Sequence, residues 1–283
     1  MPFAATTRMP EPRPVRIPDL ASKKARGEKI AMLTAYDATL ARLLEEAGID
    51  MVLVGDSVGM VALGYSTTIP VTLDAMVHHT QAVVRGTRRA LVVADLPFLT
   101  YQVSVAQALR SAARLIQEGG AAAVKLEGGR PVLAAVQRLT EVGIPVMGHL
   151  GLLPQAVHQL GGYRAQATRP QDARQLLDDA LALEAAGAFA VVLESVPAEV
   201  AGSVTAGLRI PTIGIGAGPH CDGQVLVSYD MLGLSGDRKP PFAKQYAQLA
   251  GQVLAAARAY IHEVRAGEFP AGAAAADPPK PGS

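Results

Sequence analysis

The sequence predicts an α/β protein, a single-domain (β/α)8 TIM barrel, and two observations carry that prediction. Short apolar runs recur along the chain, and helix-like patterns alternate with them. Several runs stop at a residue suited to chemistry, and these residues are Asp56, Asp95, Lys125, His149, Glu194 and Gly216. In parallel sheets the carboxyl ends of the strands open onto loops, where reactive groups are held rigidly. The repetition therefore predicts a fold and a site together.

Eight strand candidates follow one another along the chain. Most consist of uninterrupted apolar residues, as strands covered on both faces require. In order, the candidates are residues 30–35, 51–55, 91–94, 121–124, 145–148, 189–193, 212–215 and 225–231.

Helix patterns fill the intervals between the runs. Their apolar residues lie at one-face spacing, and a glycine that can adopt the left-handed conformation closes most of them. Ser104 and Gln107 form a capping-box pattern ahead of one helix. The last pattern has an apolar stripe that suits packing across the barrel or into a subunit interface. The apolar positions of these helices span residues 40–47, 108–116, 131–139, 176–183 and 242–264.

Eight consecutive βα units favour a closed barrel over an open doubly wound sheet. A doubly wound fold has a glycine fingerprint at its first turn. Residues 34–37 at that position read Thr-Ala-Tyr-Asp, without glycine.

Composition narrows the class of protein. The chain has 283 residues, 49% of them hydrophobic, and a net charge of +1. It thus has enough apolar surface for one large core, and no overall charge that would draw it to nucleic acid or to anionic membranes. A single cysteine, Cys221, excludes an internal disulfide, and no run of about 18 apolar residues spans a membrane. We therefore expect a cytoplasmic protein.

The expected organisation has three parts. Residues 1–20 are rich in proline and are expected to form a flexible arm, residues 21–268 the barrel, and residues 269–283 a disordered tail. The basic cluster at residues 23–29 is expected to be a solvated part of the chain before the first strand.

Two aspartates suggest a metal site. Asp56 and Asp95 follow neighbouring strands, so their carboxylates can converge, and oxygen ligands with room for water suit Mg²⁺ better than zinc. Each aspartate could instead cap the following loop or helix. The residues alone leave both interpretations open.

Further strand-end residues suit acid–base chemistry. Lys125 and Glu127 point to the same side of a strand. Lys125 could bind a substrate carboxylate and Glu127 a metal-bound water, or the two could form an internal salt bridge. In apolar surroundings Glu194 would gain basicity and could abstract a carbon-bound proton, or it could pair with an arginine. His149 could donate a hydrogen bond to a substrate, or it could be an ordinary buried polar group.

Three weaker signals accompany them. The glycines at 214, 216 and 218 predict a permissive loop after the seventh strand, where barrels often bind ligands with backbone. Residues 161–163, Gly-Gly-Tyr, predict a lid or a turn. The adjacent His78 and His79 point to different faces of a helix and cannot form a metal pair.

The motifs together resemble the ketopantoate hydroxymethyltransferase family, in order and spacing, from about residue 20 to residue 268. The matching segments are VGDSVGM at 54–60, ADLPF at 94–98, VKLEGG at 124–129, GHLGL at 148–152, GGY at 161–163, LE at 193–194 and IGIGAG at 213–218. Two positions depart from the family pattern: Leu153 stands where threonine is common, and Ser195 where cysteine is frequent.

The resemblance implies a (β/α)8 enzyme of the phosphoenolpyruvate/pyruvate superfamily that assembles as a homodecamer. It implies transfer of a hydroxymethyl group from 5,10-methylenetetrahydrofolate to 3-methyl-2-oxobutanoate, giving 2-dehydropantoate for pantothenate and coenzyme A synthesis. By the same resemblance, Mg²⁺ is bound by Asp56, Asp95 and, through water, Glu127, and it chelates the keto acid. Ser57 and Lys125 hold the substrate carboxylate, Glu194 accepts the proton from C3, and His149 lines the pocket.

Two rival hypotheses remain at this point. Another Mg²⁺-dependent enzyme of the superfamily, such as a carbon–carbon lyase acting on a 2-oxo acid, would share the metal chemistry but need no folate. A barrel without catalytic activity would bind or scaffold only. The presence of Asp56, Asp95, Lys125 and Glu194 together argues against the second rival.

Overall fold

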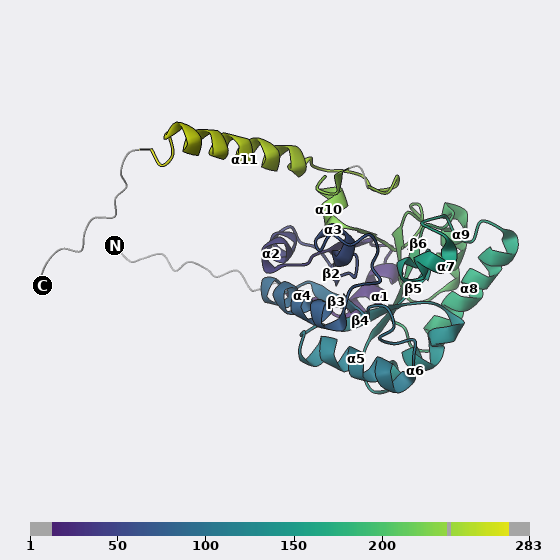
Figure 1. The fold of residues 1–283 in the computed structure, drawn as a ribbon. Coiled ribbons are helices and arrows are strands. Elements are labelled where there is room, and N and C mark those ends of the chain that lie inside the picture. The colour runs from purple at the N-terminus through teal and green to yellow at the C-terminus, as the bar shows by residue number, and fades with distance from the viewer. Residues whose placement is uncertain (1–12, 237–238, 272–283) are drawn as a thin grey trace, which may run out of the picture. The chain divides into compact units, whose positions relative to one another are not determined.

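The chain forms a closed barrel of eight parallel strands, which confirms the predicted (β/α)8 fold (Figure 1). The structure, a computed structural model, describes residues 13–236 and 239–271. Each strand pairs in parallel with the next, and the last pairs with the first. The strands are β1 (Ile30–Thr34), β2 (Met51–Val54), β3 (Leu91–Asp95), β4 (Ala123–Glu127), β5 (Val146–Gly151), β6 (Ala190–Glu194), β7 (Thr212–Ile215) and β8 (Gly223–Leu226).

Helices follow most of the strands, and those labelled α4, α5, α6, α8 and α9 surround the sheet in Figure 1. Two 3-10 turns, η1 (Arg130–Val132) and η2 (Pro154–Ala156), precede α6 and α7. The helices are α1 (Ile17–Ala25), α2 (Ala38–Glu46), α3 (Val58–Val61), α4 (Leu73–Gly86), α5 (Val105–Gln117), α6 (Leu133–Glu141), α7 (Val157–Leu160), α8 (Pro170–Ala185), α9 (Ala198–Gly207), α10 (Ser228–Met231) and α11 (Leu249–Ala266).

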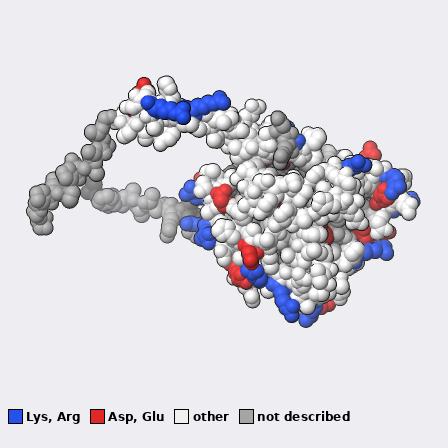
Figure 2. All heavy atoms as spheres, in the orientation of Figure 1, with Lys and Arg blue, Asp and Glu red and all other residues white. Residues whose placement is uncertain are grey.

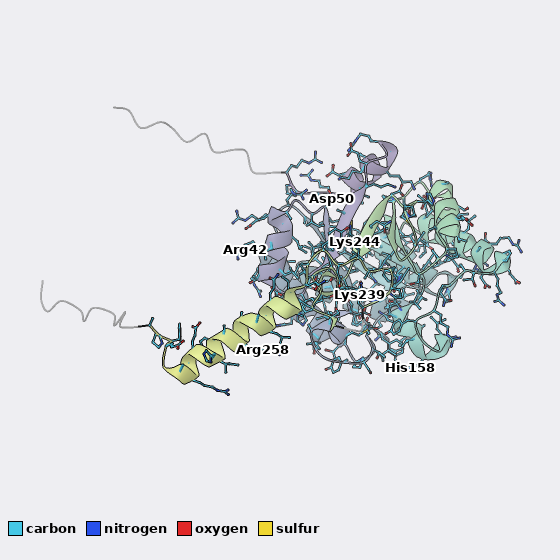
Figure 3. The ribbon with its side chains drawn as sticks, turned by 90° about the horizontal axis from the view of Figure 1, so that it is seen from above. Arg42, Asp50, His158, Lys239, Lys244 and Arg258 are labelled. Carbon is cyan, nitrogen blue, oxygen red and sulfur yellow. The ribbon has the colours of Figure 1, made fainter. Side chains whose placement is uncertain are left out.

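Local sequence signals explain where helices begin. The side chain of Asp37 accepts a hydrogen bond from the Leu40 amide at the start of α2, and Ser104 accepts one from the Gln107 amide at the start of α5. The predicted capping box is only half formed, because the Gln107 side chain donates to the Leu99 carbonyl instead. Polar residues such as Arg42 on α2 point away from the barrel (Figure 3).

The barrel interior is a packed apolar core. Strand residues such as Met32, Met51, Val93 and Met147 share one buried cluster. Strands β2, β3 and β4 are buried along their whole length, as expected of a sheet covered on both faces. The rigid core fixes the strand ends, where the candidate site lies.

Helix α1 corrects the expected N-terminal arm. Residues 17–20 belong to this helix, and Leu20, which is 1% exposed, joins the barrel core. Lys23 pairs with Asp50 at 2.9 Å and Lys24 with Asp222 at 2.8 Å, so this part of the basic cluster is tied to the barrel rather than solvated. Residues 1–12 of the expected arm, and 272–283 of the expected tail, lie outside the described residues.

Two boundaries near the C-terminus differ from the prediction. Strand β8 begins at Gly223, which pairs with Ile30, and ends at Leu226, whereas the predicted strand ran over 225–231. The last helix begins at Leu249, so Phe242 and Tyr246 precede it.

The chain divides into two compact units, residues 1–228 and 229–283. The first contains the barrel, so the barrel is shorter than the predicted span of 21–268. The second contains α11, none of whose residues is buried, and its exposed apolar side chains include Val253, Leu254, Ile261 and Val264. None of the helices in the described ranges is both long and apolar enough to cross a membrane. On the face shown in Figure 2, basic and acidic residues are interspersed around the barrel unit.

Candidate active site at the carboxyl ends of the strands

The predicted site residues meet at one end of the barrel, because the sheet register places them side by side. Asp95 at the end of β3 is level with Lys125 on β4, and Glu127 is level with His149 on β5. Glu194 ends β6 opposite Gly151. The Asp56 amide, just beyond β2, donates to Asp95 Oδ2 at 3.0 Å. The structure thus brings together side chains that are up to 138 positions apart.

Lys125 lies at the centre of this cluster. Its Nζ is 3.1 Å from Asp95 Oδ1, and both side chains are almost completely buried, 5% and 3% exposed. Burial disfavours the ammonium, but the carboxylates of Asp95, Glu127 and Asp56 outweigh it and hold the pKa of Lys125 above its ordinary value. Lys125 therefore stays charged, and its ion-pair partner is Asp95 rather than Glu127.

His149 lies between two glutamates. Its Nδ1 is 3.5 Å from Glu127 Oε1 and 3.3 Å from Lys125 Nζ, and its Nε2 is 3.2 Å from Glu194 Oε2 without hydrogen-bond alignment. Burial and Lys125 act to lower the pKa of His149, but Glu127 and Glu194 raise it to about 9. Glu194 therefore has a histidine neighbour, where the sequence left open apolar surroundings or an arginine.

The carboxylates differ in their environment. The pKa of Asp56 is well above its usual range because the group is buried and lies near Asp95 and Glu127. Burial also raises the pKa of Asp95, against the opposing effect of Lys125. Burial acts in the same direction on Glu127, but hydrogen bonding to His149 and the nearby charges prevail and lower its pKa. The site concentrates more negative charge than its cations balance.

Ser57 and the Gly161-Gly162-Tyr163 segment border the same cluster. The Ser57 hydroxyl lies 2.8 Å from the hydroxyl of the buried Tyr36. Tyr163 is half exposed, and its hydroxyl contacts Met60 Sδ at 3.4 Å. Partial burial and the nearby Glu194 raise the pKa of Tyr163, which places this segment close to the carboxylates.

Other predicted positions lie elsewhere or have structural roles. His79 Nδ1 is 2.7 Å from the Tyr36 carbonyl oxygen. Gly218 after β7 has a φ of +75°, and an added Cβ would meet Ala198. Cys221 is completely buried.

Three residues of the site escaped sequence analysis: Tyr36, Tyr101 and Gln155. The Gln155 side chain donates to Asp56 Oδ2 at 2.9 Å, and the Gln155 amide donates to Glu127 Oε2 at 3.0 Å. The Tyr101 hydroxyl donates to Gln155 Oε1 at 2.8 Å. These residues follow strand ends, but they lack the charge that marked the others.

The donor set fits a hard divalent cation bound by few protein ligands. No group of three or more His, Cys, Asp or Glu side chains in the described ranges is arranged as a metal site by itself. Mg²⁺ commonly uses one or two carboxylates and completes its shell with water and substrate oxygens. Asp95 Oδ1 is buried and has only the ion pair with Lys125 at 3.1 Å, and Asp56 is adjacent. The two aspartates can therefore hold such an ion, but the described side chains do not enclose it.

Fold and site together define a class: a (β/α)8 barrel with a buried cluster of carboxylates, a lysine and a histidine at the catalytic end of its strands. The ketopantoate hydroxymethyltransferase family model matches residues 14–272. The 3-methyl-2-oxobutanoate hydroxymethyltransferase of Thermosynechococcus vestitus is 61% identical over 259 residues, covering 91% of this chain and 99% of that protein. The enzyme of the same name from Moorella thermoacetica is 58% identical, covering 90% and 95%. This chain belongs to the ketopantoate hydroxymethyltransferase family.

Solved structures that resemble the chain share its fold at low sequence identity. Phosphonopyruvate hydrolase in complex with oxalate and Mg²⁺ matches with a TM-score of 0.57 at 16% identity, covering 89% of this chain and 87% of that one. A 2,3-dimethylmalate lyase of the PEP mutase/isocitrate lyase superfamily matches with a TM-score of 0.56 at 18% identity, covering 93% and 92%.

Proposed function

We propose that this protein transfers a hydroxymethyl group from 5,10-methylenetetrahydrofolate to 3-methyl-2-oxobutanoate, forming 2-dehydropantoate. The observation that carries the proposal is the convergence of Asp56, Asp95, Lys125 and Glu194 at one end of the barrel of a family member. The relatives' names give the keto acid and the transferred group. The folate, the metal and the part of each residue are inferred from the resemblance and the chemistry of the site.

Mg²⁺ would be held by Asp56 and Asp95, with Glu127 joining through water. When bound, such an ion supplies Lewis-acid stabilisation for negative charge that develops on the substrate oxygens. The crystallised phosphonopyruvate hydrolase holds Mg²⁺ together with oxalate, a small dianion, on the same fold. The two buried carboxylates of Asp56 and Asp95, which adjoin each other at the ends of neighbouring strands, are the feature of this chain that supports the assignment.

The remaining residues bind the keto acid and move its proton. Lys125, charged because carboxylates surround it, would bind the substrate carboxylate together with the Ser57 hydroxyl, which Tyr36 orients. Glu194 would accept the proton from C3, and the resulting carbanion would attack the methylene carbon of methylenetetrahydrofolate. The carbon–nitrogen bonds to the folate would break, releasing tetrahydrofolate, and water would supply the hydroxyl oxygen of the product. His149 Nε2 lies 3.2 Å from Glu194 Oε2, so the imidazole would line the pocket beside the base.

The variant Glu194→Gln tests this assignment. In D2O, exchange of the C3 hydrogen of 3-methyl-2-oxobutanoate, followed by NMR, should slow by about 10²- to 10⁴-fold, the usual contribution of a general base. Mg²⁺ binding should persist. Glu199→Gln, an exposed residue of α9, is the matched control and should exchange at the normal rate. A normal exchange rate in Glu194→Gln would refute the proposal that Glu194 accepts the C3 proton.

Folate dependence separates the proposal from a carbon–carbon lyase. Product formation from 3-methyl-2-oxobutanoate should require methylenetetrahydrofolate. Turnover of a 2-oxo acid without folate would favour the lyase.

We further propose that the protein is a cytoplasmic homo-oligomer, a decamer as the resemblance implies. The lone thiol, Cys221, is free and buried, which fits a reducing compartment. Leu254 and the other exposed apolar side chains of α11 supply a surface for a second copy. Leu254→Asp should lower the molar mass measured by light scattering, whereas Gln252→Asp, on the opposite side of α11, should not. An unchanged mass for Leu254→Asp would exclude α11 from the interface.

A further inference from the structure

Gln155 is a buried neutral residue that contacts two of the proposed metal-binding carboxylates. It lies in the turn η2 after β5 and is 5% exposed. Its side-chain Nε2 donates to Asp56 Oδ2 at 2.9 Å, and its backbone amide donates to Glu127 Oε2 at 3.0 Å. One residue therefore restrains carboxylates that come from β2 and β4.

The side-chain amide of Gln155 has a single satisfactory orientation. Its Nε2 also donates to the Leu96 carbonyl at 2.9 Å, which uses its second hydrogen. Its Oε1 accepts from the Tyr101 hydroxyl at 2.8 Å and from Gln102 Nε2 at 3.1 Å. Rotating the amide by 180° would place Oε1 against Asp56 and the Leu96 carbonyl, where it would face only acceptors.

Tyr101 anchors this arrangement. It is buried, and its hydroxyl accepts a hydrogen bond from the Glu127 amide at 3.0 Å. With that lone pair used, the hydroxyl hydrogen points toward Gln155 Oε1 and the Glu127 carbonyl, 3.1 Å away. The hydroxyl therefore couples the backbone of β4 to the amide that holds Asp56.

A neutral donor suits this position. Asp56, Asp95 and Glu127 repel one another, and a lysine or arginine in place of Gln155 would neutralise the charge that a cation needs. The amide stabilises ionised Asp56 through Oδ2 without adding charge. A cation bound through Asp56 Oδ1, and a water bound through Glu127 Oε1, would leave both hydrogen bonds of Gln155 intact.

We infer that Gln155, oriented by Tyr101, is the positioning residue that sets the binding geometry of Asp56 and Glu127 for the divalent cation. The inference rests on the cation site of the proposed function. Neighbours of this kind that orient metal ligands typically contribute 10- to 100-fold to metal affinity.

The test is Mg²⁺ titration of the full-length protein by isothermal calorimetry, without substrate. Gln155→Leu, which keeps the volume but removes all side-chain hydrogen bonds, should weaken Mg²⁺ binding about 10- to 100-fold. Tyr101→Phe should weaken it about 2- to 10-fold, the equivalent of one hydrogen bond. Gln137→Leu is the matched control: Gln137 donates to Glu141 at 2.9 Å on the surface of α6, and its loss should leave Mg²⁺ affinity unchanged.

The outcomes distinguish this inference from the proposed function. Wild-type affinity in a folded Gln155→Leu variant would overturn the inference and leave the proposed function standing. A wild-type protein that binds no Mg²⁺ would overturn both. Loss of Mg²⁺ affinity in a variant that keeps the wild-type melting temperature without metal would establish positioning rather than a general structural role. If Gln155→Leu does not fold, Tyr101→Phe decides: unchanged affinity in that variant overturns the inference.

Discussion

Replacing Lys125 by methionine should destabilise the barrel strongly, because it leaves carboxylates buried without their counter-ion. Lys125 Nζ lies 3.1 Å from Asp95 Oδ1, and the two side chains are 5% and 3% exposed. Methionine fills a similar volume, so the change removes charge and hydrogen-bonding capacity with little effect on packing. Removing one partner of a buried pair typically costs about 3–5 kcal/mol. A barrel of this size loses about 2–4 °C of melting temperature per kcal/mol, which gives a fall of roughly 6–20 °C.

Urea unfolding followed by circular dichroism in the presence of EDTA measures the effect without a metal contribution. Arg169→Met is the control, because Arg169 forms an ion pair with Asp172 at 2.7 Å but is 80% exposed. Exposed pairs contribute about 0–1 kcal/mol. The double variant Asp95→Asn/Lys125→Met removes both charges and should recover part of the loss. If Lys125→Met destabilises no more than Arg169→Met, the reasoning from buried charge is refuted.

Two further predictions concern backbone and thiol. Gly151→Ala should slow C3 exchange and should destabilise the protein more than the control variant Gly143→Ala does. Both glycines have φ near +90°, but only at Gly151 would an added Cβ overlap the carbonyl of Glu194. The left-handed conformation alone costs an alanine about 1–2 kcal/mol of stability in each variant. Equal C3 exchange rates in the two variants would show that Gly151→Ala does not displace Glu194. Cys221 is completely buried, and burial raises the pKa of its thiol, so Ellman's reagent at pH 8 should react only after denaturation. Rapid reaction of the native protein would contradict this.

The sequence predicted the barrel well because strands buried on both faces leave a local signature. The charged strand ends could be recognised for the same reason. Asp95 and Glu194 each follow directly after four or five apolar residues, a pattern that is visible without knowing the tertiary structure. The error at β8 has a local cause. Val225, Leu226 and Val227 continue an apolar pattern past the end of the strand, whereas its first residues, Gly223 and Gln224, are not apolar.

Features set by distant contacts could not be predicted. Lys24 looked solvated because its partner, Asp222, is 198 positions away. Gln155 has no periodicity or charge to mark it, and its role depends on Asp56, 99 positions earlier. The relation between Glu194 and His149 likewise became visible only when adjacent strands placed them 3.2 Å apart.

The balance of charge supports the proposed divalent cation. With all four carboxylates of Asp56, Asp95, Glu127 and Glu194 ionised, at most two cations, Lys125 and His149, face them, which leaves at least two negative charges uncompensated. Such an excess is costly in a buried environment, and the protein alone can relieve it only by protonation, as the raised pKa of Asp56 indicates. A bound dication would supply two positive charges at once. The same argument explains the neutral amide at position 155, since a cationic side chain there would stabilise the empty site and weaken the binding that the aspartates make possible.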